Sequence, residues 1–528
     1  MKILVTDPLS QEGIEILEQE AEVTKDFCED LGRLKDIIEK YDALIVRSGT
    51  TVPAEVIDAG KKLKVIGRAG VGVDNIDVNR ATQQGIMVIN APEGNTISAA
   101  EHTIAMITSI ARNIPGANAS VKKGEWKRGQ YMGVELYQKT LGVLGLGKIG
   151  TEVARRCRAM GMTLLAYDPY ISTERAAKRG VELVSLDELL TRSDFITLHL
   201  PLVTSTYHLL GENQFSMMKD GVRIINCARG GLIDEQALCQ ALDEGKVAGA
   251  ALDVFETEPP GDCPLLEYDN VISTPHLAAS TLEAQVNVAM QVARQVLRAL
   301  NGELVDYAVN VPVMEPEVLE DVKPFLPLMQ LLGSLYMQLY SGSVDEVEVH
   351  YSGDIAEKPL KSLTTSCLIG FLQVMVGSQV NYVNASYLAQ QRGIRIKEMF
   401  TSSSENFSSL VTVKVMSGNE INYISGTLFN DNDIRLVQIG EYRIEVVPSR
   451  YMLVCNYYDL PGVIGKVASI LGTRDINIAS MQVGRKSVGG EALMVLQVDE
   501  VVPTDLLEKI REMDNIIYIK FVELPSRD

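Results

Sequence analysis

Short apolar runs alternate with amphipathic stretches through the first 98 residues. The apolar runs have the length of strands and lie at Ile3–Val5, Ala43–Val46, Val65–Ile66 and Met87–Ile89. The stretches between them, such as Gln11–Glu20 and Leu31–Lys40, place apolar residues on one face of a helix. Strands that alternate with helices in this way predict an α/β domain with a parallel sheet.

The pattern is most regular between Thr140 and Asp168. An apolar strand (Leu141–Leu144) leads into the turn GLGKIG, a helix follows, and a second apolar strand ends at Asp168. Further strands of a continuing sheet are expected at Phe195–Leu200, Val222–Cys227, Ala248–Val254 and Val271–Thr274. The whole pattern predicts a Rossmann domain rather than an isolated Gly-rich turn.

Two long helices frame this domain, at 99–111 and 281–300. The second should lead the chain back to the first domain. We therefore expect a discontinuous, flavodoxin-like α/β domain (1–98 and 283–310) with a Rossmann domain (99–282) inserted in it. A small-molecule cleft would lie between the two.

The regular alternation of strands and helices ends after residue 310. Val311–Pro316 has the composition of a linker, and the following residues mix helices with strands such as Val347–Tyr351 and Ser409–Val415. Residues 451–528 follow a compact βαββαβ order. The expected C-terminal units are an α+β domain at 311–450 and a βαββαβ domain at 451–528.

The composition narrows the class of protein. The 528 residues carry a formal net charge of −20, which argues against nucleic-acid or anionic-membrane partners. Seven cysteines are dispersed without a CxxC pair, no metal-ligand spacing occurs, and no apolar run is long enough to cross a bilayer. A cytoplasmic enzyme without a metal is the expectation, and an anionic substrate would need local arginine clusters.

The Gly-rich turn and Asp168 predict the cofactor. The glycines allow a tight turn, the helix that follows can donate N–H groups to a pyrophosphate, and Asp168 can accept from a ribose diol. A 2′-phosphate about 4 Å from that carboxylate would be repelled by roughly 4 kcal/mol at an effective dielectric constant near 20. NAD is therefore favoured over NADP.

Polar residues follow the strands of both predicted sheets. Arg47, Arg68 and Asn95 are candidates for holding an anion, and the turn 69–72 could present N–H groups beside them. Because ligands bind beyond the carboxyl ends of parallel strands, His199, Arg229, Asp253 and His276 should line one crevice over the cofactor. His102, on the apolar helix at 99–111, is interpreted as a packed rather than a catalytic histidine.

Arg229, Glu258 and His276 form the predicted catalytic set. Arg229 can bind a carboxylate through two N–H groups, His276 can exchange a proton with a hydroxyl, and Glu258 can fix the imidazole tautomer. A surface glutamate and a helix-capping histidine are the structural alternatives. Together, the three suit the oxidation of a 2-hydroxy acid by NAD.

The runs GLGKIG, YDP, NCARGGLIDEQAL, ALDVFETEPP and STPHLAAST resemble the D-isomer-specific 2-hydroxyacid dehydrogenase family. NYYDLPGVIGKVASIL and INIASMQVGR resemble an ACT domain, and the segment before them resembles the intervening domain of long-form members. The resemblance implies oxidation of 3-phospho-D-glycerate to 3-phosphohydroxypyruvate, the first step of L-serine biosynthesis. It also implies L-serine as an effector and a homo-oligomer, dimeric or tetrameric.

The resemblance also implies the roles of individual residues. The implied sets are Arg229, Glu258 and His276 for catalysis; Gly145, Gly147, Lys148, Ile149, Asp168, Cys227, Arg229, Asp253 and His276 for NAD; Arg47, Arg68, Asn95 and Arg128 for substrate, Arg128 across a dimer; and Tyr457, Asp459 and Asn477 for serine.

Three alternatives stay open at this point. They are a related dehydrogenase of lactate, glyoxylate or formate, a corepressor-like NAD sensor, and an amino-acid-binding regulator with an inactive catalytic half. The C-terminal domains count against the first two, and the complete Arg/Glu/His set counts against the third.

Overall fold

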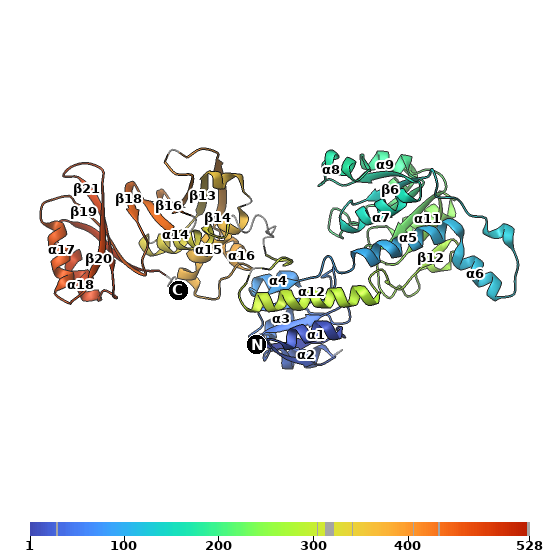
Figure 1. Ribbon diagram of the computed structural model, residues 1–528, viewed down its shortest axis with the longest axis horizontal. Coiled ribbons are helices and arrows are strands. Elements are labelled where there is room, and N and C mark those ends of the chain that lie inside the picture. Colours follow the sequence, from blue (N-terminus) through green and yellow to red (C-terminus); the bar gives the residue numbers. More distant parts are fainter. Residues whose placement is uncertain are drawn as a thin grey trace.

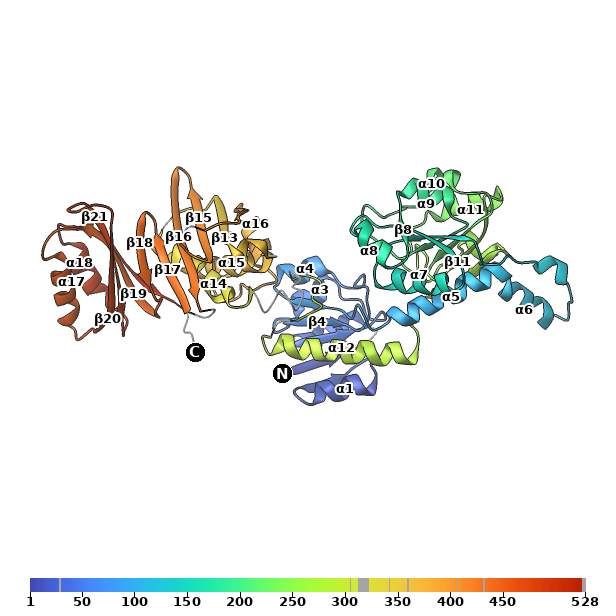
Figure 2. The same ribbon diagram turned by 45° about the horizontal axis from the view of Figure 1, so that its top comes forward.

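A computed structural model describes residues 1–27, 30–303, 305–311, 322–340, 342–358, 360–404, 406–430 and 433–524. The molecule is elongated, and its N-terminal sheet lies between the dinucleotide-binding region and the C-terminal region (Figure 1). The view in Figure 2 shows the same order of the three regions. Most of the predicted linker Val311–Pro316 lies outside the described residues.

The first sheet is parallel, with the order β2-β1-β3-β4-β5 of a flavodoxin-like fold. Its strands are β1 (Lys2–Val5), β2 (Glu22–Lys25), β3 (Ala43–Val46), β4 (Val65–Arg68) and β5 (Met87–Ile89). Its helices are α1 (Gln11–Glu18), α2 (Leu31–Ile38), α3 (Ala54–Ala59) and α4 (Val78–Gln83). Strand β2 was not predicted, because this edge strand lacks an apolar run.

Helix α12 (Leu282–Leu300) packs on the first sheet although it follows the second sheet in sequence (Figures 1 and 2). A Cβ atom on Gly67 of β4 would lie 2.8 Å or less from Val292 and Val296, so the glycine permits this close packing. The chain therefore crosses between the two regions twice. The two crossings are joined by a 2.7 Å hydrogen bond between the hydroxyl groups of Ser98 and Thr281.

The second sheet is also parallel, with the order β12-β11-β10-β9-β6-β7-β8. This is the Rossmann order with one additional strand. The strands are β6 (Thr140–Leu144), β7 (Thr163–Tyr167), β8 (Glu182–Leu183), β9 (Phe195–Leu198), β10 (Val222–Asn226), β11 (Val247–Leu252) and β12 (Val271–Ser273). The helices include α5 (Thr96–Arg112), α6 (Ile114–Lys122), α7 (Lys148–Ala159), α8 (Thr173–Lys178), α9 (Leu186–Arg192), α10 (Glu212–Met217) and α11 (Glu235–Asp243).

Four predicted strands end one or two residues earlier in the structure, at Leu198, Asn226, Leu252 and Ser273. Their last predicted residues leave the hydrogen-bonded ladder where the chain turns into the loops that carry the polar side chains. The alternation of α and β elements, the Rossmann sheet and the flavodoxin-like sheet are confirmed.

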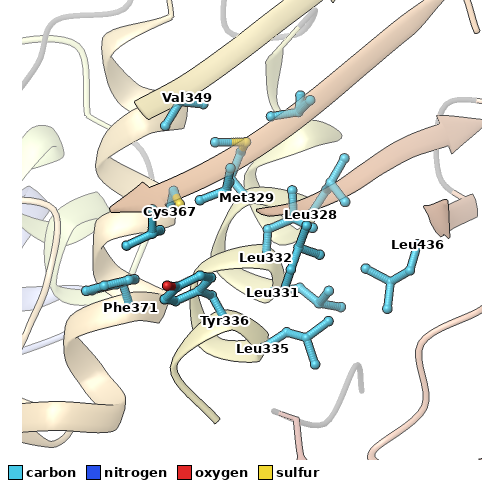
Figure 3. Packing of buried hydrophobic residues seen from close by; sticks show 14 of the residues in the cluster. Leu328, Met329, Leu331, Leu332, Leu335, Tyr336, Val349, Cys367, Phe371 and Leu436 are labelled. Carbon is cyan, nitrogen blue, oxygen red and sulfur yellow. The ribbon is translucent and has the colours of Figure 1, made fainter. Parts of the chain in front are cut away.

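The third sheet is mixed, in the order β14-β13-β15-β16-β17-β18, and covers two helices. The strands are β13 (Glu346–Gly353), β14 (Arg395–Thr401), β15 (Ser409–Ser417), β16 (Glu420–Phe429), β17 (Asp433–Ile439) and β18 (Tyr442–Val446). Helices α14 (Phe325–Leu339) and α15 (Lys361–Val376) pack closely, because a Cβ on Gly333 would lie 2.1 Å from the Cys367 carbonyl oxygen. Figure 3 shows Tyr336, Phe371 and the leucines of α14 in this core.

The C-terminal unit follows the predicted βαββαβ order, with an antiparallel sheet β20-β21-β19-β22. The elements are β19 (Tyr451–Tyr458), α17 (Val463–Gly472), β20 (Ile478–Arg485), β21 (Glu491–Val498), α18 (Thr504–Arg511) and β22 (Ile516–Glu523). Met452, Val454 and Val522 belong to the same buried cluster as the core of the third sheet, so one face of the C-terminal sheet packs on the preceding unit. The other face forms a separate core with α17 and α18.

Among the helices that the structure describes, none combines the length and the apolar character needed to cross a bilayer.

Candidate active site

The Gly-rich turn joins β6 to α7 in the geometry that a dinucleotide requires. Gly145 has φ +94°, and a Cβ there would lie 2.6 Å from the His199 carbonyl oxygen. Gly147 is the N-cap of α7, and no atom lies within 4 Å of the position that its Cβ would take. The start of α7 is therefore open to a pyrophosphate, whose charge suits the helix N-terminus.

Asp168 faces this turn from the end of β7. Its two carboxylate oxygens accept hydrogen bonds from the backbone N–H groups of Leu146 and Tyr170, each at 2.9 Å. Arg179, which the sequence analysis did not select, donates to the Leu146 carbonyl oxygen at 2.8 Å. The turn is thus held from both sides, and the carboxylate stands where the sequence places a ribose contact.

Lys148 and Ile149, the next two predicted NAD residues, contact different parts of the structure. The Lys148 ammonium lies 2.6 Å from the Glu93 carboxylate and 5.8 Å from the centre of the Tyr307 ring. Glu93 and Tyr307 both belong to the first region, so Lys148 connects the nucleotide turn to it. Ile149 is half-buried and packs against the core of the Rossmann sheet.

A cavity of about 330 Å³ lies where the two sheet regions face each other. It is lined by six residues that the sequence analysis predicted, namely Arg47, Arg68, Asn95, Arg229, Glu258 and His276. Among the described residues, Arg68 Nε and Asn95 Oδ1 are buried without a hydrogen-bond partner. Unpartnered buried polar atoms are costly, so their presence here indicates a ligand site.

Two arginines lie directly against the loop that follows β4. A Cβ on Gly70 would lie 1.5 Å from Arg68 Nη1, and one on Gly72 would lie 2.1 Å from Arg229 Nη2. Burial, together with the nearby Arg229, lowers the pKa of Arg68 from its usual value. The crowding of positive charge prepares the cavity for an anion, in a chain that is acidic overall.

Arg229 is held by the loop that follows β10. The Asn226 side chain donates to the Arg229 carbonyl oxygen at 2.8 Å, and Arg229 Nη1 donates to the Ala228 carbonyl oxygen at 2.7 Å. A Cβ on Gly230 would lie 1.8 Å from the Phe255 carbonyl oxygen, which explains the glycine. Arg229 Nε also lies 3.2 Å from the carboxylate of Asp74, a lining residue that spacing did not reveal.

His276 and Glu258 form the predicted pair. His276 Nδ1 lies 2.8 Å from Glu258 Oε2, and the other carboxylate oxygen accepts from the Phe255 backbone N–H at 3.2 Å. Because a carboxylate only accepts hydrogen bonds, Nδ1 carries the proton and Nε2 is left to accept one. The pair can therefore take a proton at Nε2 from a hydroxyl in the cavity.

Asp253 is fully buried and stays ionised. Burial opposes its charge, yet hydrogen bonds from His102, Thr274 and the backbone of Leu277 and Ala278 hold the pKa of Asp253 below its usual value. The interpretation of His102 as merely packed therefore omitted its polar contact with this carboxylate. Helix periodicity assigns the residue to a packed face but cannot reveal a partner 151 residues away in the sequence.

Two other strand-end residues are kept neutral by burial. Burial lowers the pKa of His199 to about 4, and its ring lies 3.0 Å from the Thr197 hydroxyl. Burial, aided by Asp253, raises the pKa of the Cys227 thiol to about 12. Of these two, Cys227 lies beside Asp253, while His199 does not line the cavity with Arg229 and His276.

Arg128 is not part of the cavity of its own chain. It lies in a short 3-10 helix (Arg128–Tyr131) beyond α6, and α6 extends away from the Rossmann sheet in both views (Figures 1 and 2).

The three predicted serine residues do not meet within one chain. Tyr457 is fully buried, and Asp459 Oδ2 lies 3.5 Å from Arg485 Nη1 at one end of the C-terminal sheet. Asn477 donates to Asp499 at 2.7 Å beside Val498, which pairs with Tyr451 at the other end. Six residues of strand β19 separate the two ends, a distance of about 20 Å at the usual rise per residue.

The prediction that no metal is bound stays a prediction. Within the described part of the chain, ligand atoms of His208, Asp234 and Glu256 lie within 4.8 Å of one another. His208 Nε2 already lies 2.9 Å from Glu256 Oε1, and all three residues are partly exposed. This arrangement is accounted for by the ion pair alone.

The Rossmann sheet, the open helix start and Asp168 together define an NAD-dependent oxidoreductase. Residues 104–278 match the family described as D-isomer specific 2-hydroxyacid dehydrogenase, NAD binding domain. Residues 321–440 match the D-3-phosphoglycerate dehydrogenase intervening domain, and residues 451–515 match the ACT domain.

Relatives that align over nearly the whole chain are named D-3-phosphoglycerate dehydrogenase. The chain is 48% identical over 516 residues to a D-3-phosphoglycerate dehydrogenase of Synechocystis sp., covering 98% of this chain and 93% of the relative. It is 44% identical to the enzyme of that name from Bacillus subtilis, covering 99% and 100% of the two chains. The chain therefore belongs to the D-3-phosphoglycerate dehydrogenase family.

Solved structures of related enzymes match the first two regions. The apo-structure of D-lactate dehydrogenase from Escherichia coli is 32% identical and covers 58% of this chain and all of its own, with a TM-score of 0.52. A glyoxylate reductase from Paecilomyes thermophila is 34% identical and covers 58% and 98% of the two chains, with a TM-score of 0.55. These matches leave the C-terminal units uncovered.

Proposed function

We propose that this chain oxidises 3-phospho-D-glycerate to 3-phosphohydroxypyruvate with NAD, the first step of L-serine biosynthesis. The observation that carries the proposal is the cavity in which three arginines converge on the His276–Glu258 pair. A substrate with a carboxylate at one end and a phosphate at the other requires two positive sites. Lactate and glyoxylate require only one.

The proposed roles follow from the positions of the groups. Arg229 and the Arg68 loop hold the carboxylate, and Arg47 holds the phosphate. His276 accepts the C2 hydroxyl proton at Nε2, while Glu258 keeps Nδ1 protonated and stabilises the charged imidazole that results. When bound, NAD supplies the acceptor for the hydride that leaves C2.

NAD fits the nucleotide side of the cleft. The open N-terminus of α7 would take the pyrophosphate, and Asp168 would accept from the ribose hydroxyls. Among the described residues, Ala278 alone donates to Asp253 Oδ2, so this oxygen retains an acceptor position for the carboxamide near Cys227. Gly145, Lys148 and Ile149 complete this side.

We further propose the domain limits 1–98 with 283–310 for substrate, 99–282 for NAD, 311–450 for the intervening domain and 451–528 for the ACT domain. The packing of α12 on the first sheet supports the discontinuous first domain. We propose a homo-oligomer, dimer or tetramer, in which the extended α6 segment carries Arg128 to the phosphate of a partner's substrate. The free, dispersed thiols of the described cysteines support a reducing compartment, the cytoplasm.

NAD reduction with 3-phospho-D-glycerate tests the proposed function. We expect kcat/KM for 3-phospho-D-glycerate to exceed that for D-glycerate by about 10- to 150-fold, because a charge-assisted phosphate contact contributes about 1.5–3 kcal/mol. Replacing NAD by NADP should lower kcat/KM by at least about tenfold, because of Asp168. The reaction can also be followed in reverse with NADH and 3-phosphohydroxypyruvate. Equal rates with D-lactate and 3-phospho-D-glycerate would contradict the proposal.

L-serine is the proposed allosteric effector, bound between two ACT domains. Among the described strands, β20 forms ladder hydrogen bonds only with β21, and Gly484 near its Arg485 end packs against Arg443 of β18. If two β20 edges pair antiparallel about a two-fold axis, the Arg485 end of one strand meets the Ile478 end of the other. Asp459 of one chain then approaches Asn477 of the second, beside the buried Tyr457.

Asp459→Ala and Asn477→Ala should each raise the L-serine concentration for half-inhibition by about tenfold or more, since each loses a hydrogen bond of roughly 1.5–3 kcal/mol to a charged ligand. Glu508→Gln, on the exposed face of α18, is the matched control. Steady-state inhibition curves are the measurement. Inhibition that is unchanged in both alanine variants would place the effector site elsewhere, and a wild-type chain insensitive to L-serine would refute feedback.

A further inference from the structure

His102 lies on α5 and contacts the catalytic loop from outside the cavity. Its Nε2 atom is 3.2 Å from the Thr274 hydroxyl and 3.3 Å from Asp253 Oδ1. The Thr274 hydroxyl is itself 2.6 Å from Asp253 Oδ1. The three side chains therefore form one compact hydrogen-bonded group, and Asp253 at its centre is fully buried.

The chemistry of the group assigns the proton on His102. The carboxylate of Asp253 can only accept, so the single hydroxyl hydrogen of Thr274 points to Asp253. Thr274 is then left to accept from His102, which requires a proton on Nε2. His102 thus serves as a donor to both Thr274 and Asp253.

Asp253 holds the backbone that carries His276. Its Oδ1 accepts from the Leu277 N–H at 2.7 Å, and its Oδ2 accepts from the Ala278 N–H at 2.9 Å. Its carbonyl oxygen accepts from the His276 N–H at 2.9 Å. His276 has φ +54°, a left-handed conformation that costs a non-glycine residue roughly 1–2 kcal/mol, so it must be maintained by its surroundings.

Helix α5 also begins at one of the two crossings between the domains. Thr96 starts the helix, Ser98 hydrogen-bonds to Thr281 at the second crossing, and His102 lies one turn further along. The imidazole therefore connects the crossing helix to the loop of the catalytic base. Any shift of α5 relative to β12 would act on Asp253 through this contact.

We propose that His102 is a positioning residue, which fixes the Asp253 carboxylate and through it the backbone conformation of His276. The proposal rests on the proposed function only in that His276 is taken as the base. It predicts an effect on turnover and little effect on binding, because His102 does not line the substrate cavity.

The test compares His102→Leu with His102→Gln. We expect His102→Leu to lower kcat by about 10- to 100-fold, because a small displacement of a catalytic group is costly. The KM for 3-phospho-D-glycerate should stay within about threefold, under 0.7 kcal/mol. His102→Gln retains an N–H donor and should recover kcat to within about threefold of wild type. If His102 only stabilised the fold, its loss would not lower kcat while leaving KM unchanged, and the leucine and glutamine variants would not differ in kcat.

Thr274→Val makes the same test without a change in α5. It should lower kcat to a similar degree, and the double variant with His102→Leu should fall little further, because the two residues act through one carboxylate. Thr108→Val is the control: Thr108 lies on the same helix, and its hydroxyl bonds to a carbonyl of that helix. We expect wild-type kcat for it.

Two results would overturn the inference: an unchanged kcat in both His102→Leu and Thr274→Val, or an equal loss in the leucine and glutamine variants. Absence of turnover by the wild-type chain on 3-phospho-D-glycerate would instead refute the proposed function. The comparison of variants would then be made on the 2-hydroxy acid that the wild-type chain does oxidise, and it would decide the inference in the same way.

Discussion

His276→Ala should lower kcat for 3-phospho-D-glycerate by about 10²- to 10⁴-fold, the usual contribution of a general base. The imidazole lies in the cavity with Nδ1 bonded to Glu258, so Nε2 is the group available to accept the hydroxyl proton. Alanine removes that acceptor without adding bulk, and the arginines that hold the substrate remain. The loss should therefore appear in kcat rather than in KM.

Steady-state kinetics with NAD, together with a separate NAD titration, measure this effect. His350→Ala is the matched control, because His350 lies on β13 of the third sheet and bonds to Glu348, far from the cleft in sequence and fold. Retention of wild-type kcat by His276→Ala would exclude His276 as the base.

Arg229→Lys should lower kcat/KM by about 10²- to 10³-fold, although it keeps the positive charge. The guanidinium lies against Gly72, with Nη1 and Nε engaged by the Ala228 carbonyl and Asp74. This fixed orientation directs a planar fork at the substrate carboxylate, and a lysine ammonium cannot reproduce two parallel N–H groups. The expected loss corresponds to about 3–4 kcal/mol.

The control is Arg192→Lys, at a partly exposed ion pair with Glu182 on the edge of the Rossmann sheet. Surface pairs contribute little, so wild-type kinetics are expected for it. Wild-type kcat/KM in Arg229→Lys would mean that charge alone holds the carboxylate. The same variant assayed with D-lactate should lose activity in proportion, because lactate presents the same carboxylate.

The fold could be predicted from the sequence largely because apolar runs of strand length alternate regularly with amphipathic helices. The βαββαβ unit at 451–528 and the return of α12 to the first sheet both followed from that pattern. Strand β2, with the sequence EVTK, could not be found in this way, because this half-buried edge strand has a single apolar residue and so no apolar run. The strands that end at Leu198 and Ser273 were predicted too long, since an apolar run does not show where pairing stops.

The site residues that lie in short sequence motifs could be predicted. Arg229, Glu258 and His276 each lie in a short distinctive run, and they line one cavity in the structure. Asp74 and His102 were not selected, because their importance depends on partners 155 and 151 residues away in the sequence. Spacing within a sequence carries no information on such contacts.

The double crossing between the first two domains has a mechanical consequence. A single connecting segment would let one domain bend, slide and twist on the other. Two segments joined by the Ser98–Thr281 hydrogen bond act as a two-stranded hinge. They leave one axis of rotation and suppress torsion about the connection. Closure of the cleft would then follow one path and would bring Arg47 and Arg68 to the same places relative to His276 each time.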